Sequence, residues 1–505
     1  MLLPVLLVLP LFGHTTQNDL PTQTISMTSL QNNSSPYVTM IPKPSSLSTS
    51  PWLVYPTNST IWVGGFSTLE GLPPTSQISE FFINGTSRLV VTVHNLILGS
   101  ILPDPIKPLT KIWFTENSTL AFFDTDDKTQ TTETKAITFP GEIIQYMASD
   151  SQKQIWMTVA GPAGSSSIIM YSPSNRSNHT YSVPTNDAII QGLTVAPDDT
   201  IWFAEAGSKK IGHLVPESGQ PPLEFNPPPS INLYAPIQVA LDKSGNVWFT
   251  DHGSNQFGEL DTHNQPPIWK VFPIGYCLDN CLYGLPNSIF ADAKNTIWFS
   301  EHIAGRIGHY DPSTGVLTEY SVPGSSFPLV WWAMPGPYNL VWFVSYDLQQ
   351  IGYVNASLPV TFSVNGVSPG INVQKGSYQR VPIFVTSTGP EQLSFNSSAL
   401  SQDASGYTPF VYSSFQSTTT SGAGLYSTSI QIFAAWNATL GQRVMAVTTF
   451  DPRVSLSMFV RVNVVDSTFP YLTMGAVFLV IPGGIVAVVR ALSSPKKKYP
   501  RKPGV

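Results

Sequence analysis

The chain has 505 residues, enough for more than one domain, and 42% of them are hydrophobic, which supplies material for large buried cores. Only 11% are charged, the formal net charge is −6, and no basic patch precedes the last fifteen residues, which excludes nucleic acid as an expected partner. Serine, threonine, proline, glycine and aromatic residues replace the missing charges, a composition that favours strands and turns over helices.

The chain begins with an apolar run from Met1 to Phe12 that resembles the apolar part of a secretion signal, although it lacks a basic start. We assign 1–17 to this signal-like segment. The following residues, 18–35, are rich in Ser, Thr, Asn and Gln and predict a disordered segment. Ten Asn-x-Ser/Thr sequons fit an exposed glycoprotein, although a chain this rich in Ser and Thr would contain several by chance. They lie at Asn32, Asn33, Asn58, Asn84, Asn117, Asn175, Asn178, Asn355, Asn396 and Asn437.

Seven short apolar segments, each with a central tryptophan, repeat along the next part of the chain. The tryptophans are 51, 43, 46, 46, 50 and 44 residues apart. One strand core per period of this length is typical of four-stranded propeller blades, so we predict a seven-bladed β-propeller over 36–357. The tryptophans are Trp62, Trp113, Trp156, Trp202, Trp248, Trp298 and Trp342.

Two further regularities support the ring. In four blades an apolar residue nine positions after the tryptophan is followed by glycine, which we expect to pack against a large ring, the tryptophan of the neighbouring blade. The glycines are Gly212, Gly258, Gly308 and Gly352. The segment from Tyr37 to Pro42 carries the aromatic-to-proline signature of the outer strands without a blade of its own. It is predicted to supply the outer strand of the seventh blade and to close the ring.

The chain contains two cysteines, Cys277 and Cys281, in one loop between predicted strands. A zinc site would need further ligands at suitable spacing, whereas an extracellular chain favours a disulfide. We therefore predict a small disulfide-closed loop on the same face of the ring as Asn287 and Glu301.

Short strand-like runs with turn signals occupy 358–466 and predict an immunoglobulin-like β-sandwich. We interpret it as a spacer, with a second binding module as the alternative. Next, Tyr471 to Val489 is an uncharged run whose nineteen residues would span about 28 Å as a helix, close to the thickness of a bilayer core. We predict one transmembrane helix over 470–490 and a basic cytoplasmic tail over 491–505. The propeller and the sandwich are then held outside the cell membrane.

The second-strand motif, Trp-Phe-x-Glu followed by Ile-Gly, resembles the repeat of the streptogramin B lyases, also called virginiamycin B lyases. The resemblance covers about 37–357 and is strongest from Thr200 to Val354. It implies a seven-bladed propeller whose active members open a cyclic depsipeptide antibiotic by elimination, with a magnesium ion, acidic ligands and histidines on one face of the ring. Elimination needs a base beside a carbonyl and a cation that stabilises the enolate-like charge.

An acid occupies the third position after the tryptophan in four blades. Because the motif recurs at the same point of each blade, Glu205, Asp251 and Glu301 are expected to converge near the channel mouth as metal ligands. Carboxylates held close repel one another unless a cation lies among them, which predicts Mg²⁺ or Ca²⁺. The alternative is that each acid caps a local turn or pairs with a neighbouring cation such as Arg306. The fourth acid, Glu116, is a candidate binding residue.

The histidines implied by the resemblance are not found. Fourteen residues before the second-strand acid position, where the lyases carry a histidine, this chain has Gln145, Gln191, Ile237, Asn287 and Trp331. An amide cannot act as a base at neutral pH, so Gln191, Asn287 and Trp331 are candidate binding residues. His252 and His302 directly follow second-strand acids and are the candidates for a relocated catalytic base. The alternative for both is packing between blades.

Two functions remain open from the sequence. The first is a membrane-anchored extracellular propeller that binds a glycan, a peptide or an envelope protein, with a divalent cation at the channel mouth. The second is a carbon-oxygen lyase or hydrolase in which His252 or His302 is the base. The missing histidines favour the first function, because the second is supported only by the acids and by analogy with the fold.

Overall fold

The computed structural model describes residues 35–68, 73–82, 86–94, 97–130, 132–274, 284–324, 328–366, 370–399, 411–415 and 419–466. Over these residues the chain consists of strands and the short 3-10 helices η2 (Pro162–Gly164), η3 (His252–Ser254) and η4 (Pro337–Asn339), so the predicted all-β class is confirmed. The signal-like segment, the predicted disulfide of Cys277 and Cys281, and the apolar segment 470–490 all lie outside the described residues. No helix in the described ranges has the length and hydropathy needed to cross a membrane.

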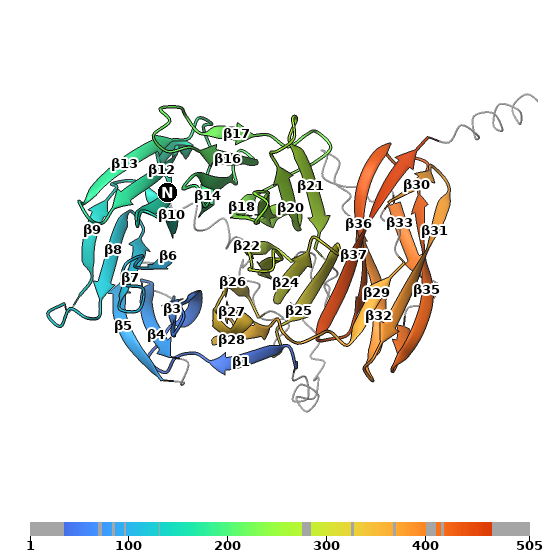
Figure 1. Cartoon of the computed structure of the whole chain (residues 1–505), viewed down its shortest axis with the longest axis horizontal. Coiled ribbons are helices and arrows are strands. Elements are labelled where there is room, and N and C mark those ends of the chain that lie inside the picture. Colours follow the sequence, from blue (N-terminus) through green and yellow to red (C-terminus); the bar gives the residue numbers. More distant parts are fainter. Residues whose placement is uncertain are drawn as a thin grey trace, which may run out of the picture.

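Seven antiparallel four-stranded units form a ring in the described chain (Figure 1). The first strands of neighbouring units contact each other around the centre, as in a propeller. Blade 1 contains β2 (Ser50–Pro56), β3 (Thr60–Ser67), β4 (Thr75–Phe82) and β5 (Ser87–His94). Blade 2 contains β6 (Leu98–Pro103), β7 (Lys111–Glu116), β8 (Thr119–Asp124) and β9 (Thr134–Thr138). Blade 3 contains β10 (Ile143–Ser149), β11 (Ile155–Ala160), β12 (Ser166–Ser172) and β13 (Ser177–Ser182).

The remaining blades follow the same plan. Blade 4 contains β14 (Ile190–Val195), β15 (Ile201–Glu205), β16 (Lys210–Leu214) and β17 (Leu223–Phe225). Blade 5 contains β18 (Pro236–Leu241), β19 (Val247–Asp251), β20 (Gln256–Asp261) and β21 (Ile268–Pro273). Blade 6 contains β22 (Pro286–Ala291), β23 (Ile297–Glu301), β24 (Arg306–Asp311) and β25 (Val316–Ser321). Blade 7 contains β26 (Val330–Pro335), β27 (Leu340–Ser345), β28 (Gln350–Asn355) and β1 (Val38–Pro42).

The strand β1 closes the ring as predicted. It pairs with β28 in antiparallel register from Val38 opposite Val354 to Pro42 opposite Gln350. Tyr37, just before the strand, is buried and its ring lies 5.7 Å from that of Tyr320 in blade 6. The outer edge of blade 7 is therefore covered by the beginning of the described chain.

The repeated aromatic residues hold each blade together. Most of the tryptophans are fully buried, and several donate the indole N–H to an aspartate in the turn before the second strand, for example Trp248 to Asp242 at 3.0 Å. The expectation that the repeated glycines face a tryptophan of the next blade is wrong. Gly308 lies opposite Phe299 of its own blade, and a Cβ there would overlap the phenyl ring. Gly212, Gly258 and Gly352 face Phe203, Phe249 and Phe343 in the same way.

The region after the ring forms two further sheets that enclose a shared core. One sheet contains β29 (Phe362–Asn365), β31 (Tyr378–Ser387), β35 (Gly424–Ala434) and β33 (Val411–Phe415). The other contains β30 (Gly370–Gln374), β37 (Val454–Val465), β36 (Gly441–Phe450), β32 (Gln392–Ala399) and β34 (Thr419–Ser421). These pairings do not decide the immunoglobulin-like class, which stays a prediction.

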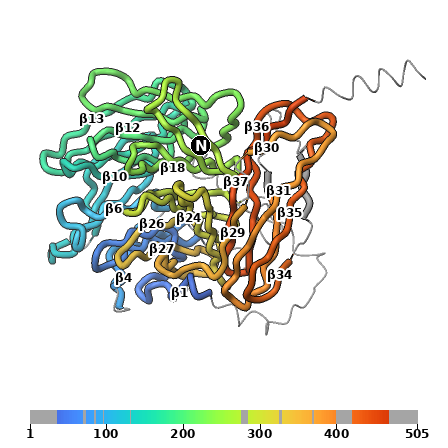
Figure 2. Tube along the Cα trace, turned by 45° about the vertical axis from the view of Figure 1, so that its right-hand side comes forward, coloured from blue at the N-terminus to red at the C-terminus, as the bar shows by residue number. Residues whose placement is uncertain are grey.

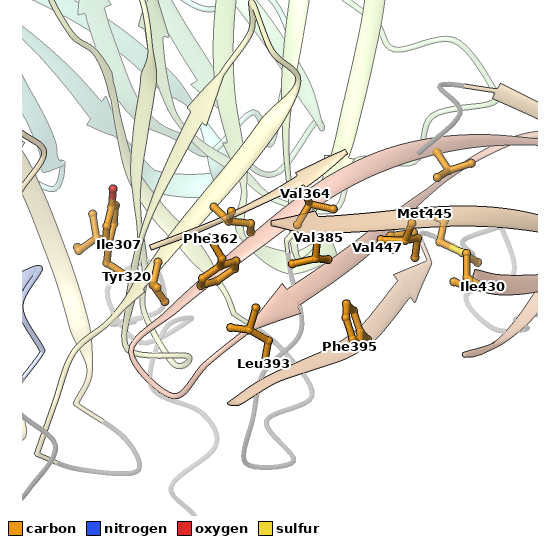
Figure 3. Packing of buried hydrophobic residues seen from close by; sticks show 14 of the residues in the cluster. Ile307, Tyr320, Phe362, Val364, Val385, Leu393, Phe395, Ile430, Met445 and Val447 are labelled. Atoms are coloured by element: carbon orange, nitrogen blue, oxygen red, sulfur yellow. The ribbon is translucent and has the colours of Figure 1, made fainter. Parts of the chain in front are cut away.

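The second sheet continues directly into the propeller, a feature that the sequence did not indicate. The outer strand of blade 6, β25, pairs with β37 from Val316 opposite Met458 to Tyr320 opposite Val454. Figure 2 shows β37 on the side of the two sheets that faces the ring. One hydrophobic cluster extends across the junction, from Ile307 in blade 6 to Phe362 between the two sheets (Figure 3). The ring and the two sheets therefore share both a hydrogen-bonded ladder and a core.

Candidate functional site

Every first strand of the ring carries an irregularity at the same place. Near its beginning, two residues of the first strand face one residue of the second strand, as in a β-bulge. Bulges redirect side chains and are frequent beside functional sites. We call this end of the ring, where first strands begin and second strands end, the mouth. The first bulge residues, from blade 1 to blade 7, are Trp52, Gly99, Gln145, Gln191, Ile237, Asn287 and Trp331.

Aromatic rings gather on one side of the mouth, over blades 5, 6, 7 and 1. Trp52 stacks on Trp331 of the neighbouring blade, with 4.2 Å between ring centroids and 15° between planes. Trp331 in turn lies 4.6 Å from the ring of His302. We call the connected set the aromatic arc; it consists of Trp52, Phe66, His252, His302, Trp331 and Tyr346. The two tryptophans are half-buried, so part of each ring remains accessible to a ligand.

The other side of the mouth, over blades 2, 3 and 4, is lined by small and amide-bearing residues. The bulge residues there are Gly99, Gln145 and Gln191. Gln145 and Gln191 are half-buried, and the Nε2 atom of Gln145 is itself buried without a hydrogen-bond partner among the described residues. The mouth therefore combines an aromatic side with a side that can donate and accept hydrogen bonds.

The centre of the ring below the mouth is filled by side chains. Tyr55, Tyr146, Trp332 and Met334 come together from three blades, and the space left among them has a volume of about 10 Å³. Burial raises the pKa of the Tyr146 hydroxyl, so it stays protonated. A space of this size holds at most one water molecule. Any ligand larger than water must therefore bind at the mouth and not within the ring at this point.

The two candidate catalytic histidines lie in the aromatic arc. Burial lowers the pKa of His302 to about 3 and that of His252 to about 4. His252 Nδ1 lies 3.1 Å from the carbonyl oxygen of Pro286, an arrangement that requires the proton on Nδ1. His302 Nδ1 is buried without a hydrogen-bond partner among the described residues. Both rings are therefore neutral at pH 7, and their conjugate acids are too strong for them to serve as effective general bases.

The acids that follow the tryptophans lie at the mouth end of their blades, but no three of them form one group in the part of the chain that the structure describes. Each lies at the end of a second strand, opposite the start of its own first strand, and is buried there. Asp251 accepts hydrogen bonds from the backbone N–H groups of Tyr234 and Ala235 and from Gln256 Nε2 at 2.8 Å. Glu205 accepts one from Ser208 in the following turn, and burial raises its pKa to about 7. Asp251 and Glu205 thus each accept hydrogen bonds from nearby turns.

Glu301 belongs to a buried cluster at the junction with β37. Both of its carboxyl oxygens are buried without a hydrogen-bond donor among the described residues. The neighbouring group is a second carboxyl group, that of Glu319, which is an acceptor when ionised. Burial and the charge of Glu319 raise the pKa of Glu301 well above its usual value. Arg306 lies 3.8 Å from Glu319, and Ser455 of β37 donates a hydrogen bond to it at 2.8 Å. A proton held by Glu301 can bridge to Glu319 and satisfy both groups.

The described residues contain no group of three or more His, Cys, Asp or Glu side chains that could hold a metal ion. The expectation that Glu205, Asp251 and Glu301 meet around one Mg²⁺ or Ca²⁺ therefore gains no support. The three acids lie on second strands, one strand further from the centre of the ring than the first strands.

The candidate binding residues have distinct surroundings. Asn287 is buried and donates its side-chain amide to the carbonyl oxygen of Trp331 at 2.7 Å, which fixes the bulge of blade 7 from blade 6. The carbonyl of Gln191 accepts from Thr158 of the preceding blade, while its side chain is half-buried. Glu116 is buried 3.7 Å from Lys135 on the outer strand of its blade. Trp331 and Gln191 thus line the mouth, whereas Asn287 positions a neighbour.

Backbone strain marks the same end of the ring. The residue just before the first strand has a positive φ in three blades, 45° at Ile189, 52° at Leu285 and 47° at Leu329. Bulky residues rarely adopt this conformation, and such strain collects at ligand sites. The carbonyl groups of these residues accept hydrogen bonds from the residue after the second strand, for example Leu329 from Tyr346 at 3.2 Å. These hydrogen bonds fix the backbone of His302 and Tyr346, two members of the aromatic arc.

Comparisons with known proteins bear on the fold. No protein-family model and no curated protein sequence matches the chain. A streptogramin B lyase structure is 19% identical, covers 63% of this chain and 98% of its own, and gives a TM-score of 0.51. A virginiamycin B lyase from Staphylococcus aureus, crystallised with quinupristin, is 18% identical with the same coverage and a TM-score of 0.49.

A third similar structure extends over more of the chain. The extracellular domain of a hybrid two-component system from B. thetaiotaomicron is 13% identical, covers 86% of this chain and 58% of its own, and gives a TM-score of 0.46. At these identities the similarity concerns the fold and not the activity. The ring of this protein therefore has the β-propeller fold of the streptogramin B lyases.

Proposed function

We propose that this chain is a binding protein that takes up a neutral saccharide at the mouth of its propeller. The observation that carries the proposal is the stack of Trp52 on Trp331, two large half-buried rings held 4.2 Å apart at the point where both first strands bulge. A sugar ring has one apolar face, which packs on an aromatic surface, and hydroxyl groups around its edge. Gln191 across the mouth supplies an amide for those hydroxyls.

The protonation and hydrogen bonding of the histidines and acids near the mouth favour binding without catalysis. The histidines in the arc have lowered pKa values, and Asp251 and Glu205 accept hydrogen bonds from neighbouring residues. A lyase or hydrolase would need a base and an electrophile within reach of one ligand atom. We further infer that the apolar segment 471–489 anchors the chain in a membrane, with the two sheets as an immunoglobulin-like spacer that displays the ring outside the cell.

An array of neutral oligosaccharides, probed with the purified full chain, tests the proposal. Trp52→Ala or Trp331→Ala removes part of the aromatic surface and should weaken binding at least about tenfold. Burial of each ring against the sugar contributes about 1–3 kcal/mol to the free energy of binding. Trp436→Ala is the matched control, since Trp436 is 62% exposed on the region after the ring. An array without any bound sugar, or equal binding by all three variants, would overturn the proposal. Release of a cleaved product from a bound sugar would favour the enzymatic alternative.

A further inference from the structure

A large hollow lies where blade 5 meets the region after the ring, away from the mouth. It has a volume of about 590 Å³ and is bounded by β21 on one side and by β36 and β37 on the other. A second hollow of about 640 Å³ continues from it along β37 to β30, and the two share Gln442 and Arg461. Together they form a groove, which we call the junction cleft. The second part is shallow and open to solvent.

Three side-chain amides stand next to one another on the floor of the cleft. Gln442 of β36 lies directly opposite Asn463 of β37, which lies directly opposite Asn372 of β30. Asn463 Nδ2 donates to Asn372 Oδ1 at 2.9 Å. Asparagine is depleted from strands, so strand formation gives no reason for this ladder. Side-chain amides in a row offer alternating donors and acceptors, which suits the hydroxyl groups of a sugar.

The cleft also carries positive charge. Arg461 is exposed and lies two residues from Asn463 on the same face of β37. The basic residues that line the two hollows are Lys270, Arg443 and Arg461, and none of the described lining residues is acidic, although the chain as a whole has a net charge of −6. Lys270 pairs with Glu259 at 2.8 Å. Arg461 is therefore the side chain best placed to bind a ligand carboxylate in a bidentate manner.

Aromatic rings form the end of the cleft nearest the ring. Phe459 lies on the same face of β37 as Arg461, two residues earlier, and its ring is 5.1 Å from Phe272 and 5.9 Å from Tyr310. Phe459 is half-buried, so part of this aromatic surface faces the hollow. Along one strand face the cleft thus presents an aromatic ring, a guanidinium group and an amide.

We propose that the junction cleft binds an oligosaccharide that carries carboxylate groups. The carboxylate pairs with Arg461, the hydroxyl groups of adjoining sugar units bond to Gln442, Asn463 and Asn372, and an apolar sugar face packs on Phe459. An acidic peptide would satisfy Arg461 but would not use a row of amides that can both donate and accept toward hydroxyl groups. The site is separate from the mouth and does not depend on the function proposed there.

Calorimetric titration of the full chain with a tetragalacturonate tests the proposal at a fixed ionic strength. Arg461→Gln should weaken binding at least about tenfold, because a charge-assisted bidentate pair is lost, and Asn463→Ala should weaken it severalfold. Arg380→Gln is the matched control, since Arg380 is exposed on the outward face of the other sheet and should leave the affinity unchanged. The carboxyl-reduced tetrasaccharide should bind at least about tenfold more weakly to the native chain.

Several results would overturn the proposal that the junction cleft binds this oligosaccharide. They are an absence of tetragalacturonate binding, equal affinities in Arg461→Gln and the native chain, an equal loss in Arg380→Gln, or equally tight binding of a tetraglutamate peptide. Circular dichroism confirms that each variant is folded, which is expected because the substituted side chains are exposed or half-buried. Trp331→Ala should leave tetragalacturonate binding unchanged, so a failure of the mouth and a failure of the cleft can be told apart.

Discussion

Glu301 shows how burial decides what a single acid does. Its carboxyl group is fully buried beside that of Glu319, which lies 3.8 Å from Arg306 and accepts a hydrogen bond from Ser455. Two carboxylates in such a place cannot both stay ionised at low cost, so one proton shared between Glu301 and Glu319 is favoured. Glu301 is then a neutral neighbour of Glu319, the residue that accepts a hydrogen bond from β37.

The pH dependence of stability follows from this state. The folded protein holds the proton on Glu301 at pH values where the unfolded chain, with a pKa near 4.5, has released it. The free energy of unfolding should therefore fall as the pH rises from about 4.5 through the raised pKa, by about 1.4 kcal/mol for each unit of elevation. In Glu301→Gln the group is neutral at every pH, so the variant should be more stable than the native chain at pH 8 and similar near pH 4.5. Thermal unfolding across this range measures the difference.

An opposite case supplies the control. Glu224 pairs with Lys210 at 2.7 Å, and although its partial burial opposes ionisation, hydrogen bonds and the charge of Lys210 lower its pKa. Its contribution is present above the unfolded pKa, so Glu224→Gln should lower the melting temperature at neutral pH. Parallel curves for Glu301→Gln and the native chain between pH 4.5 and 8 would show that Glu301 carries no raised pKa.

The site could be predicted from sequence only where spacing alone decides position. Counting fourteen residues back from the acid located the bulge residues of blades 3 to 7, Trp331 among them. In blade 1 the spacing from Trp52 to Gly65 is 13 residues, and in blade 2 the spacing from Gly99 to Glu116 is 17, so both were missed. The stacking of Trp52 on Trp331 depends on two segments that are distant in the chain, and no local pattern reports it.

At the level of strands, β1 is the element whose loss should be most damaging. It covers the edge of β28, and both Tyr37 just before the strand and Val38 at its start are buried. A fully buried side chain of this kind contributes about 1.5–3 kcal/mol. A chain that begins at Pro44 should therefore have a lower melting temperature and aggregate through the exposed edge of β28. Differential scanning calorimetry and light scattering measure the two effects.

A chain that begins at Ser35 is the matched control for this truncation, because it removes everything before β1 and keeps the strand. It should melt as the native chain does. Equal melting temperatures for the two truncated chains would mean that the ring does not need β1 for its stability.

The closing strand was predictable, whereas the pairing of β25 with β37 was not. The signature before Pro42 repeats the ends of other outer strands and has no blade of its own, so one place in the ring was left for it. An outer strand looks the same in sequence whether its edge faces solvent or another strand, since the backbone makes the pairing. The glycine packing was predicted wrongly for a related reason. Gly308 faces Phe299 across neighbouring strands of one blade, and the sequence does not show whether this phenylalanine or the adjacent tryptophan packs on the glycine.

For the whole molecule, the shared ladder and core predict one unfolding transition. The hydrophobic cluster that contains Tyr320 in blade 6 also contains Phe362 and Ile432 of the following sheets. A fragment of residues 35–466 should therefore melt in a single calorimetric transition. Ile432→Ala, which removes a fully buried side chain at a cost of about 2–5 kcal/mol, should move that whole transition downward.

Two separate transitions in the native fragment would contradict this coupling, as would a variant in which an early transition splits from the rest. Leu425→Ala is the control, because Leu425 is 84% exposed on the same strand as Ile432 and should leave the melting temperature almost unchanged.

The place of β37 also determines how the molecule would respond to a pulling force. Tension applied beyond Asp466 would act along β37, which is paired with β36 from Val464 to Ser455 and with β25 over Val454 to Met458. A load parallel to these ladders shears many hydrogen bonds at once instead of peeling them singly. The seam between β1 and β28 lies in another blade, outside the direct path of this load. A ring tethered through β37 would therefore stay closed under drag and keep its mouth at a constant angle to its tether.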